Sequence, residues 1–141
     1  MSRDLTAHRR GAGPCGSRTG TSWAISDGSG SGNYPNNADC KWIFIASNES
    51  QVVQITFTTL DTQSGYDRVR VYDCATDDCS NATQIRVLEG SLRTGRSIVV
   101  YGTTRAMMVW FTTDSFITMG GFNATFMQVA RQSSAVNGTG L

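Results

Sequence analysis

The chain has 141 residues, 12 basic against 11 acidic side chains, and a formal net charge of +1. This length suits one domain rather than two, and the near-neutral charge excludes a field that would attract nucleic acid or an anionic membrane. No apolar run approaches the roughly 18 residues of a membrane span, and the start, "MSRDLTAHRR", lacks the apolar segment of a secretory signal.

The chain begins with a polar lead, residues 1–14, followed from about residue 21 by short strands separated by turn residues. In "DCKWIFIA", Trp42 and Phe44 alternate with Ile43 and Ile45, so we expect both faces of this strand to be covered. The later runs are expected to point the following residues inward: Val53, Ile55, Phe57, Val69, Val71, Ile85, Val87, Met107, Val109, Phe111, Phe122, Ala124 and Phe126.

The spacing of these runs predicts the fold class. No window shows a 3.6-residue period, and strands recur about every 10 to 15 residues with Gly, Asn, Asp or Ser between them. This pattern is typical of an all-β, antiparallel β-sandwich. We predict an N-terminal extension at residues 1–14, a sandwich domain at 15–129 and a C-terminal tail at 130–141.

The cysteines indicate an oxidising compartment. Cys15, Cys40, Cys74 and Cys79 allow three pairings. Their separations of 25, 34 and 5 residues lack the close pairs of a zinc site, and the one histidine, His8, lies in the lead. Disulfides are therefore the preferred interpretation.

Four Asn-X-Ser/Thr triplets agree with secretion. They place candidate N-glycans on Asn48, Asn81, Asn123 and Asn137. If Phe122 and Ala124 face the core, Asn123 must face solvent, where a glycan can be attached. Together with the cysteines, the triplets predict an extracellular glycoprotein.

Three motifs in order resemble the CUB domain family. Tyr34, Pro35, Cys40 and Trp42 match its Y-P-x-x-x-x-C-x-W segment. "ITFTTLDTQSGYDRVRVYD" is similar to its F-x-x-F-D-x-E...Y-D-x-V-x-V-Y-D block, and "VWFTTDSFITMGGFNATF" to its F-x-S-D-x-S...G-F-x-A-x-Y ending. The resemblance covers about residues 15–129, although "SDGSGSGN" replaces a more usual Ser-Pro-x-Tyr-Pro stretch, and it implies a jelly-roll-like sandwich stapled by disulfides.

The polar run "GNYPNNAD", residues 32–39, which precedes the Trp42 strand, then has a structural role. Asn, Gly and Pro suit its turns, and the family's first bridge implies that Cys40 fastens the loop through Cys15. The family's second bridge normally lies elsewhere. Here Cys74 and Cys79 bracket the polar turn "ATDD", and we predict a local bond between them.

Many CUB domains bind calcium through one Glu and two Asp and use the ion to hold a partner's Lys or Arg. By position, this set falls on Gln63, Asp67 and Asp114. The amide removes one negative charge, so we expect weak binding. Asp61 compensates if its side chain turns inward; the alternative is that Asp67 and Asp114 only satisfy loop amides.

Catalysis is not expected. His8 lies outside the domain, so no Ser–His or Cys–His pair can form within it. The glycines of "DGSGSGN" do not join a strand to a helix as in a phosphate loop, and the adjacent Asp77 and Asp78 suit an exposed turn. Met108, Trp110 and Met127 are expected on outward faces, where they form either a chance patch or a partner interface.

We therefore expect a non-catalytic extracellular module that mediates protein–protein contacts, without nucleic acid. The favoured form is a self-assembling subunit of a matrix, sheath or filament, in which residues 1–14 add to a sheet edge of the next copy. The alternative is a calcium-assisted recognition module for a separate protein or glycan, and an accessory domain of a larger secreted enzyme comes third.

Overall fold

The computed structural model describes residues 14–26, 34 and 36–131, without the side chains of residues 14 and 15. This part of the chain contains nine strands: β1 (Pro14–Thr19), β2 (Ser22–Ser26), β3 (Asp39–Ile45), β4 (Gln51–Asp61), β5 (Arg68–Cys74), β6 (Ala82–Leu88), β7 (Ile98–Tyr101), β8 (Ala106–Thr112) and β9 (Gly121–Ala130). Among the described residues there is no helix that could span a membrane.

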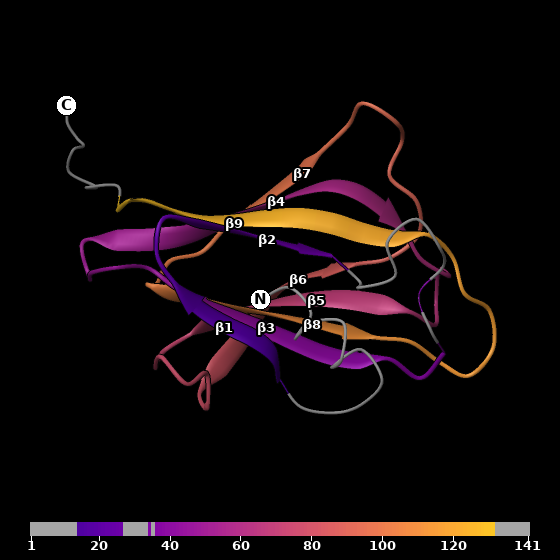
Figure 1. Ribbon diagram of the computed structural model, residues 1–141, viewed down its shortest axis with the longest axis horizontal. Coiled ribbons are helices and arrows are strands. Elements are labelled where there is room, and N and C mark those ends of the chain that lie inside the picture. The colour runs from indigo at the N-terminus through magenta and orange to yellow at the C-terminus, as the bar shows by residue number, and fades with distance from the viewer. Residues whose placement is uncertain (1–13, 27–33, 35, 132–141) are drawn as a thin grey trace.

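The strands form two sheets that stack face to face (Figure 1). The five-stranded sheet has the order β1-β3-β8-β5-β6, and the four-stranded sheet has the order β2-β9-β4-β7. The prediction of an all-β sandwich is confirmed. One pairing departs from the antiparallel rule, because β1 runs parallel to β3.

The core lies between the sheets and is built from the alternating residues of both. Trp42, Phe57 and Phe111 surround Phe122, with ring centroids 5.6, 5.9 and 5.2 Å from it. Such edge-to-face pairs add to the free energy gained by burying the rings. The predicted inward residues of β4, β5, β8 and β9 are all buried: Val53, Ile55, Phe57, Val69, Val71, Met107, Val109, Phe111, Phe122, Ala124 and Phe126.

Strand β6 departs from its predicted alternation. Val87 is 40% exposed, whereas the next residue, Leu88, is buried, and Ile85 is only partly buried. The register between β5 and β6 shifts between Val71 and Tyr72. Because a bulge moves the following side chains to the other face, the prediction that Val87 points inward is wrong.

A second, smaller hydrophobic cluster covers part of the outer face of the five-stranded sheet. The predicted Cys74–Cys79 disulfide is present and packs with Met108, which is 8% exposed, and with Ile43 and Ile45. The outward direction expected for Met108 is therefore confirmed, but the disulfide loop shields it from solvent. This packing also explains why both faces of β3 are covered.

The predicted bond joins Cys15, whose side chain lies outside the described part of the chain, to Cys40, whose side chain is described. Cys40 is disulfide-bonded, and its neighbour Lys41 pairs with Pro14 on the adjacent strand β1. This register brings the backbone of residue 15 close to β3. The pairing itself stays a prediction.

Candidate functional site

Three segments meet at one end of the sandwich: residues 34 and 36–38, the β4–β5 loop and the β8–β9 loop. Backbone bonds join the first of these to the third, from Tyr34 N to Met119 O at 3.1 Å and from Asn37 N to Asp114 O at 2.7 Å. These bonds account for the polar run before Trp42. Its turns dock against the loop that carries Asp114.

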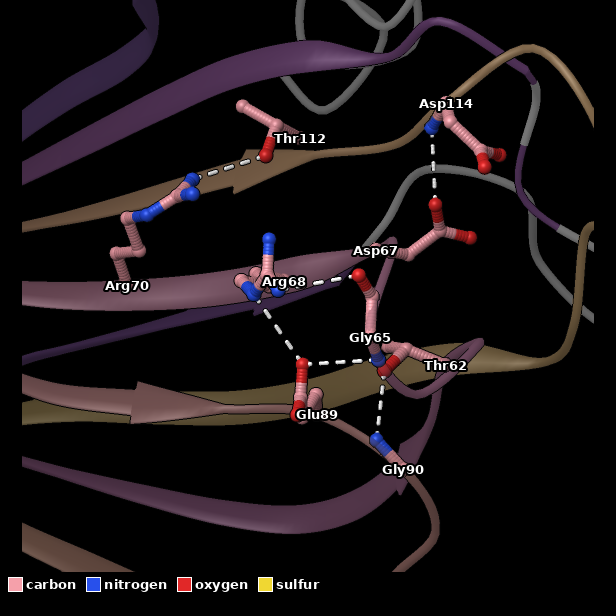
Figure 2. A network of polar contacts seen from close by, with 9 residues as sticks. All are labelled: Thr62, Gly65, Asp67, Arg68, Arg70, Glu89, Gly90, Thr112 and Asp114. Carbon is pink, nitrogen blue, oxygen red and sulfur yellow. Dashed lines mark hydrogen bonds and ion pairs between the residues drawn. The ribbon is translucent and has the colours of Figure 1, made fainter.

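Asp67 is the central side chain of this loop cluster. It is fully buried, and its Oδ2 accepts a hydrogen bond from the hydroxyl of Tyr34 at 2.5 Å. Its Oδ1 accepts from the backbone N–H of Asp114 at 2.9 Å (Figure 2). Burial of a carboxylate is unfavourable unless it is hydrogen-bonded, so these contacts fix Asp67 between the two other loops.

Tyr34 is the donor that this arrangement requires, and sequence reasoning missed the role of its phenol. Burial and the hydrogen bond to Asp67 raise the pKa of Tyr34 well above its usual value. The phenol therefore stays protonated and donates to Asp67, while its oxygen accepts from Gln63 N at 3.1 Å. The signal in the sequence was an aromatic residue within a polar, turn-rich run.

Gln63 carries an acceptor without a partner. Its backbone oxygen accepts from Asp67 N at 2.9 Å, which holds the loop closed. Its side-chain Oε1, however, is buried and has no hydrogen-bond partner among the described residues. Leaving a buried acceptor unpaired costs about 1–3 kcal/mol, so this oxygen fits a role as a ligand for a cation.

Asp114 completes the predicted set. Its side chain is half-buried, and its Oδ1 accepts from Phe116 N at 3.1 Å. The carboxylate of Asp61 does not join this set, because it accepts from Ser91 Oγ at 2.8 Å and from Gly120 N at 3.4 Å. The structure thus joins Asp67 to the backbone of Gln63 and to the backbone of Asp114 in one hydrogen-bonded unit.

The donor set is poor in charge. No group of three or more His, Cys, Asp or Glu in the described part of the chain could hold a metal ion. The set offers two carboxylates and one amide oxygen, all of them hard oxygen ligands of the kind that calcium accepts. The residues therefore fit calcium, but as a weak site.

The β4–β5 loop is held from its other side by polar contacts with the end of β6 (Figure 2). Gly65, at a φ of +88°, donates its N–H to Glu89 Oε1 at 3.1 Å. Arg68 forms an ion pair with the same oxygen at 3.2 Å and donates to the carbonyl of Gly65 at 3.0 Å. A side chain at position 65 would be strained in this conformation, so the turn depends on glycine.

Exposed apolar side chains border the cluster. Tyr66, next to Asp67, is 62% exposed, while Phe116 and Ile117 in the β8–β9 loop are 79% and 52% exposed. We call these three residues the apolar rim. Sequence reasoning did not single them out, although an apolar pair within the polar segment "DSFITMGG" was a signal.

Asp77 and Asp78, considered above as a catalytic pair, stabilise the disulfide loop instead. Asp77 forms a two-bond contact with Arg105, at 3.1 and 2.5 Å. Hydrogen bonds from the Thr76 hydroxyl and the Ser80 amide lower the pKa of Asp78 to about 2. Both carboxylates therefore have structural partners.

Three of the four candidate glycosylation sites lie in the described part. Asn48, Asn81 and Asn123 are all exposed, and the solvent-facing direction expected for Asn123 is observed. Asn123 Nδ2 donates to Thr59 Oγ1 at 2.9 Å. Asn137 and His8 lie outside the described residues.

Comparison with known proteins points to one family. Residues 15–126 match the family model of the CUB domain. The human protein "Multiple epidermal growth factor-like domains protein 8" is 30% identical over 97 residues, which are 69% of this chain and 3% of that protein. The chain therefore corresponds to a small part of this relative.

Solved structures show the same fold. The full extracellular region of zebrafish Gpr126/Adgrg6 matches with a TM-score of 0.67 at 24% identity, covering 81% of this chain and 14% of that one. The MASP-1 CUB2 domain bound to Ca²⁺ matches with a TM-score of 0.62 at 12% identity, covering 79% of this chain and 96% of that one.

Proposed function

The chain belongs to the CUB domain family, and we propose that it is a calcium-assisted recognition module that grips a partner protein outside the cell. CUB domains are non-catalytic modules that occur in extracellular and secreted proteins and typically mediate protein interactions. The observation that carries the proposal is the buried, unpaired Oε1 of Gln63, a residue whose backbone oxygen is bonded to the buried Asp67.

Calcium would be held by Gln63, Asp67 and Asp114. The MASP-1 CUB2 structure, whose fold this chain shares, contains Ca²⁺, which supports the choice of ion. In this chain the bound ion would supply positive charge to two carboxylates and pair the free amide oxygen. With one carboxylate fewer than the usual set, we expect a dissociation constant of about 10⁻⁴ to 10⁻³ M, as in other extracellular modules.

The surroundings of this set favour a protein partner. The carboxylates attract a basic side chain, and the apolar rim of Tyr66, Phe116 and Ile117 offers exposed aromatic and aliphatic surface next to it. Aromatic residues are enriched in interfaces, where they supply much of the binding energy. A partner with a Lys or Arg bordered by apolar side chains fits both features.

The rim and the calcium set share one loop. Asp114 Oδ1 accepts from the N–H of Phe116, so the carboxylate that would bind calcium also shapes the backbone that presents the aromatic ring. Calcium binding would therefore order the rim for contact. A partner should consequently bind more weakly in the presence of a chelator.

The assignment to an extracellular glycoprotein is part of the proposal. The Cys74–Cys79 disulfide and the exposed positions of Asn48, Asn81 and Asn123 support it. The self-assembling role predicted from residues 1–14 concerns a segment outside the described residues. The residues that would hold calcium, in contrast, are described, so we place recognition of a separate partner first.

Calorimetric calcium titration tests the proposal through Gln63→Glu. Adding a carboxylate to the set should tighten calcium binding by about tenfold, or ~1.4 kcal/mol. The matched control is Glu49→Gln, which changes an exposed carboxylate in the β3–β4 loop, away from the set, and should leave the affinity unchanged. Equal affinity of the native chain and Gln63→Glu, or an equal change in Glu49→Gln, would place the ion elsewhere.

A further inference from the structure

A second recognition feature lies on the outer face of the five-stranded sheet. Lys41 on β3, Trp110 on β8 and Arg70 on β5 pair directly across the strands. All three side chains are half-buried and point away from the core. We call them the cation–indole row.

The row holds two cations on one aromatic ring. Lys41 Nζ lies 4.5 Å and Arg70 Cζ 5.5 Å from the ring centroid of Trp110. Because β3 and β5 lie on opposite sides of β8, the two charges approach the indole from opposite sides. Attraction between a cation and the face of an indole keeps both side chains near the ring.

Hydrogen bonds fix the row further. Trp110 Nε1 donates to Asp39 Oδ1 at 2.6 Å, and one terminal nitrogen of Arg70 donates to Thr112 Oγ1 at 3.0 Å. The side chains are thus ordered before any ligand arrives, which lowers the entropic cost of binding.

The positive charges of the row are not neutralised within the described part of the chain. The ion pairs there join Arg68 to Glu89 and Arg105 to Asp77, and neither Lys41 nor Arg70 takes part in one. Asp39 adds one negative charge at the edge of the row, where the indole holds it. The charges of Lys41 and Arg70, which take part in no ion pair there, therefore suit an anionic ligand.

We propose that the cation–indole row binds an anionic polysaccharide that carries sulfate or uronate groups. Two strand spacings separate the backbone of Lys41 from that of Arg70, about 10 Å across the sheet, a distance comparable with the length of a disaccharide. The planar guanidinium of Arg70 can bind a sulfate or carboxylate with two hydrogen bonds.

An acidic peptide fits less well. Peptides commonly bind a sheet by adding a strand to its free edge, but β8 and β5 are interior strands that are paired on both sides. The contacts that hold the row involve none of the residues of the calcium set, so its ligand should bind without calcium.

Calorimetry in the presence of a calcium chelator tests the proposal with three probes: a heparin-derived hexasaccharide, a hexamer of galacturonic acid and a hexaglutamate peptide. The native chain should bind at least one of the two saccharides more tightly than the peptide. Comparison of the saccharides shows whether sulfate or uronate is preferred, and both results support the row. Peptide binding as tight as the better saccharide, or no saccharide binding, would overturn the proposal.

Matched variants locate the site. Lys41→Met with Arg70→Met keeps the alkyl stems that pack on the indole and should lower saccharide affinity by at least about tenfold per cation. Arg93→Met with Arg96→Met removes the same charge from the exposed loop before β7, and affinity should change by less than about twofold because distant charges are screened. Unchanged binding in the first variant, or equal losses in both, would contradict the assignment.

Discussion

Replacement of Tyr34 by Phe tests how strongly the loop cluster is held together. The tyrosine is 1% exposed, and its ring packs edge-on against Phe111 with centroids 5.2 Å apart. Phenylalanine keeps this packing and removes only the hydroxyl. The variant therefore isolates the hydrogen bonds that the phenol makes with Asp67 and Gln63.

The expected loss follows from these two bonds. A hydrogen bond to a charged group contributes about 1.5–3 kcal/mol, and the substitution leaves the buried Asp67 with one partner fewer. We expect the free energy of unfolding to fall by about 2–3 kcal/mol. For a domain of this size the melting temperature should fall by roughly 6–15 °C.

Urea denaturation followed by tryptophan fluorescence measures this loss. The midpoint should decrease at constant m value, because the surface exposed on unfolding does not change. Tyr101→Phe is the matched control, since Tyr101 is 66% exposed and its hydroxyl has no partner among the described residues. A Tyr34→Phe midpoint within error of the native one would refute the role assigned to the phenol.

Alkaline pH gives a second readout of the same contact. The pKa of Tyr34 is raised in the folded state, chiefly by burial and by the hydrogen bond to Asp67. The stability linked to this group is fully present below the unfolded pKa of about 10 and falls as pH rises above it. This component of the decrease should disappear in Tyr34→Phe.

Three further predictions concern the covalent structure and the assembly state. Non-reducing peptide mapping should recover Cys15 linked to Cys40, a bond worth up to about 3.5 kcal/mol in the loop-entropy model; a peptide joining Cys40 to another partner would contradict the pairing. Intact-mass analysis of protein from its natural source should show attached carbohydrate, which glycopeptide mapping should place on Asn81 and Asn123, and the absence of carbohydrate would count against the secreted assignment. Removal of residues 1–14 should leave a folded monomer. If the full chain self-assembles through this segment, light scattering should give a larger particle mass for the full chain than for the truncated chain, and equal masses would contradict this role.

Alternation in the sequence was enough to predict most of the sandwich. Strands such as "ITFTTL" and "RVRVYD" alternate apolar with polar residues, and the side-chain period of two places their apolar residues in the core. Strand β1 (Pro14–Thr19) was missed because "PCGSRT" has no such contrast. Its position depends on parallel pairing with β3, which no local pattern encodes.

Irregular backbone accounts for the remaining differences in the fold. The register shift beside Val71 moved Val87 to the outer face, and a bulge leaves no reliable mark in the residue types. Met108 points outward as alternation requires, but the Cys74–Cys79 loop covers it. Such cover depends on how a loop folds back, which alternation alone does not determine.

The candidate site was predictable as a set of residues, but not as a geometry. Family resemblance placed Gln63, Asp67 and Asp114, and the structure joins them through loop hydrogen bonds. The contact between Tyr34 and Asp67 spans 33 positions in the chain. It depends on the docking of two loops, so it required the three-dimensional structure.

The most direct test of calcium-assisted recognition is a calcium titration of the native chain followed by amide NMR. Our account predicts millimolar binding with chemical shift changes concentrated at residues 63–67 and 114–117, which carry the ligand set and most of the apolar rim. Absence of shifts at saturating calcium, or shifts confined to another surface, would contradict the central claim.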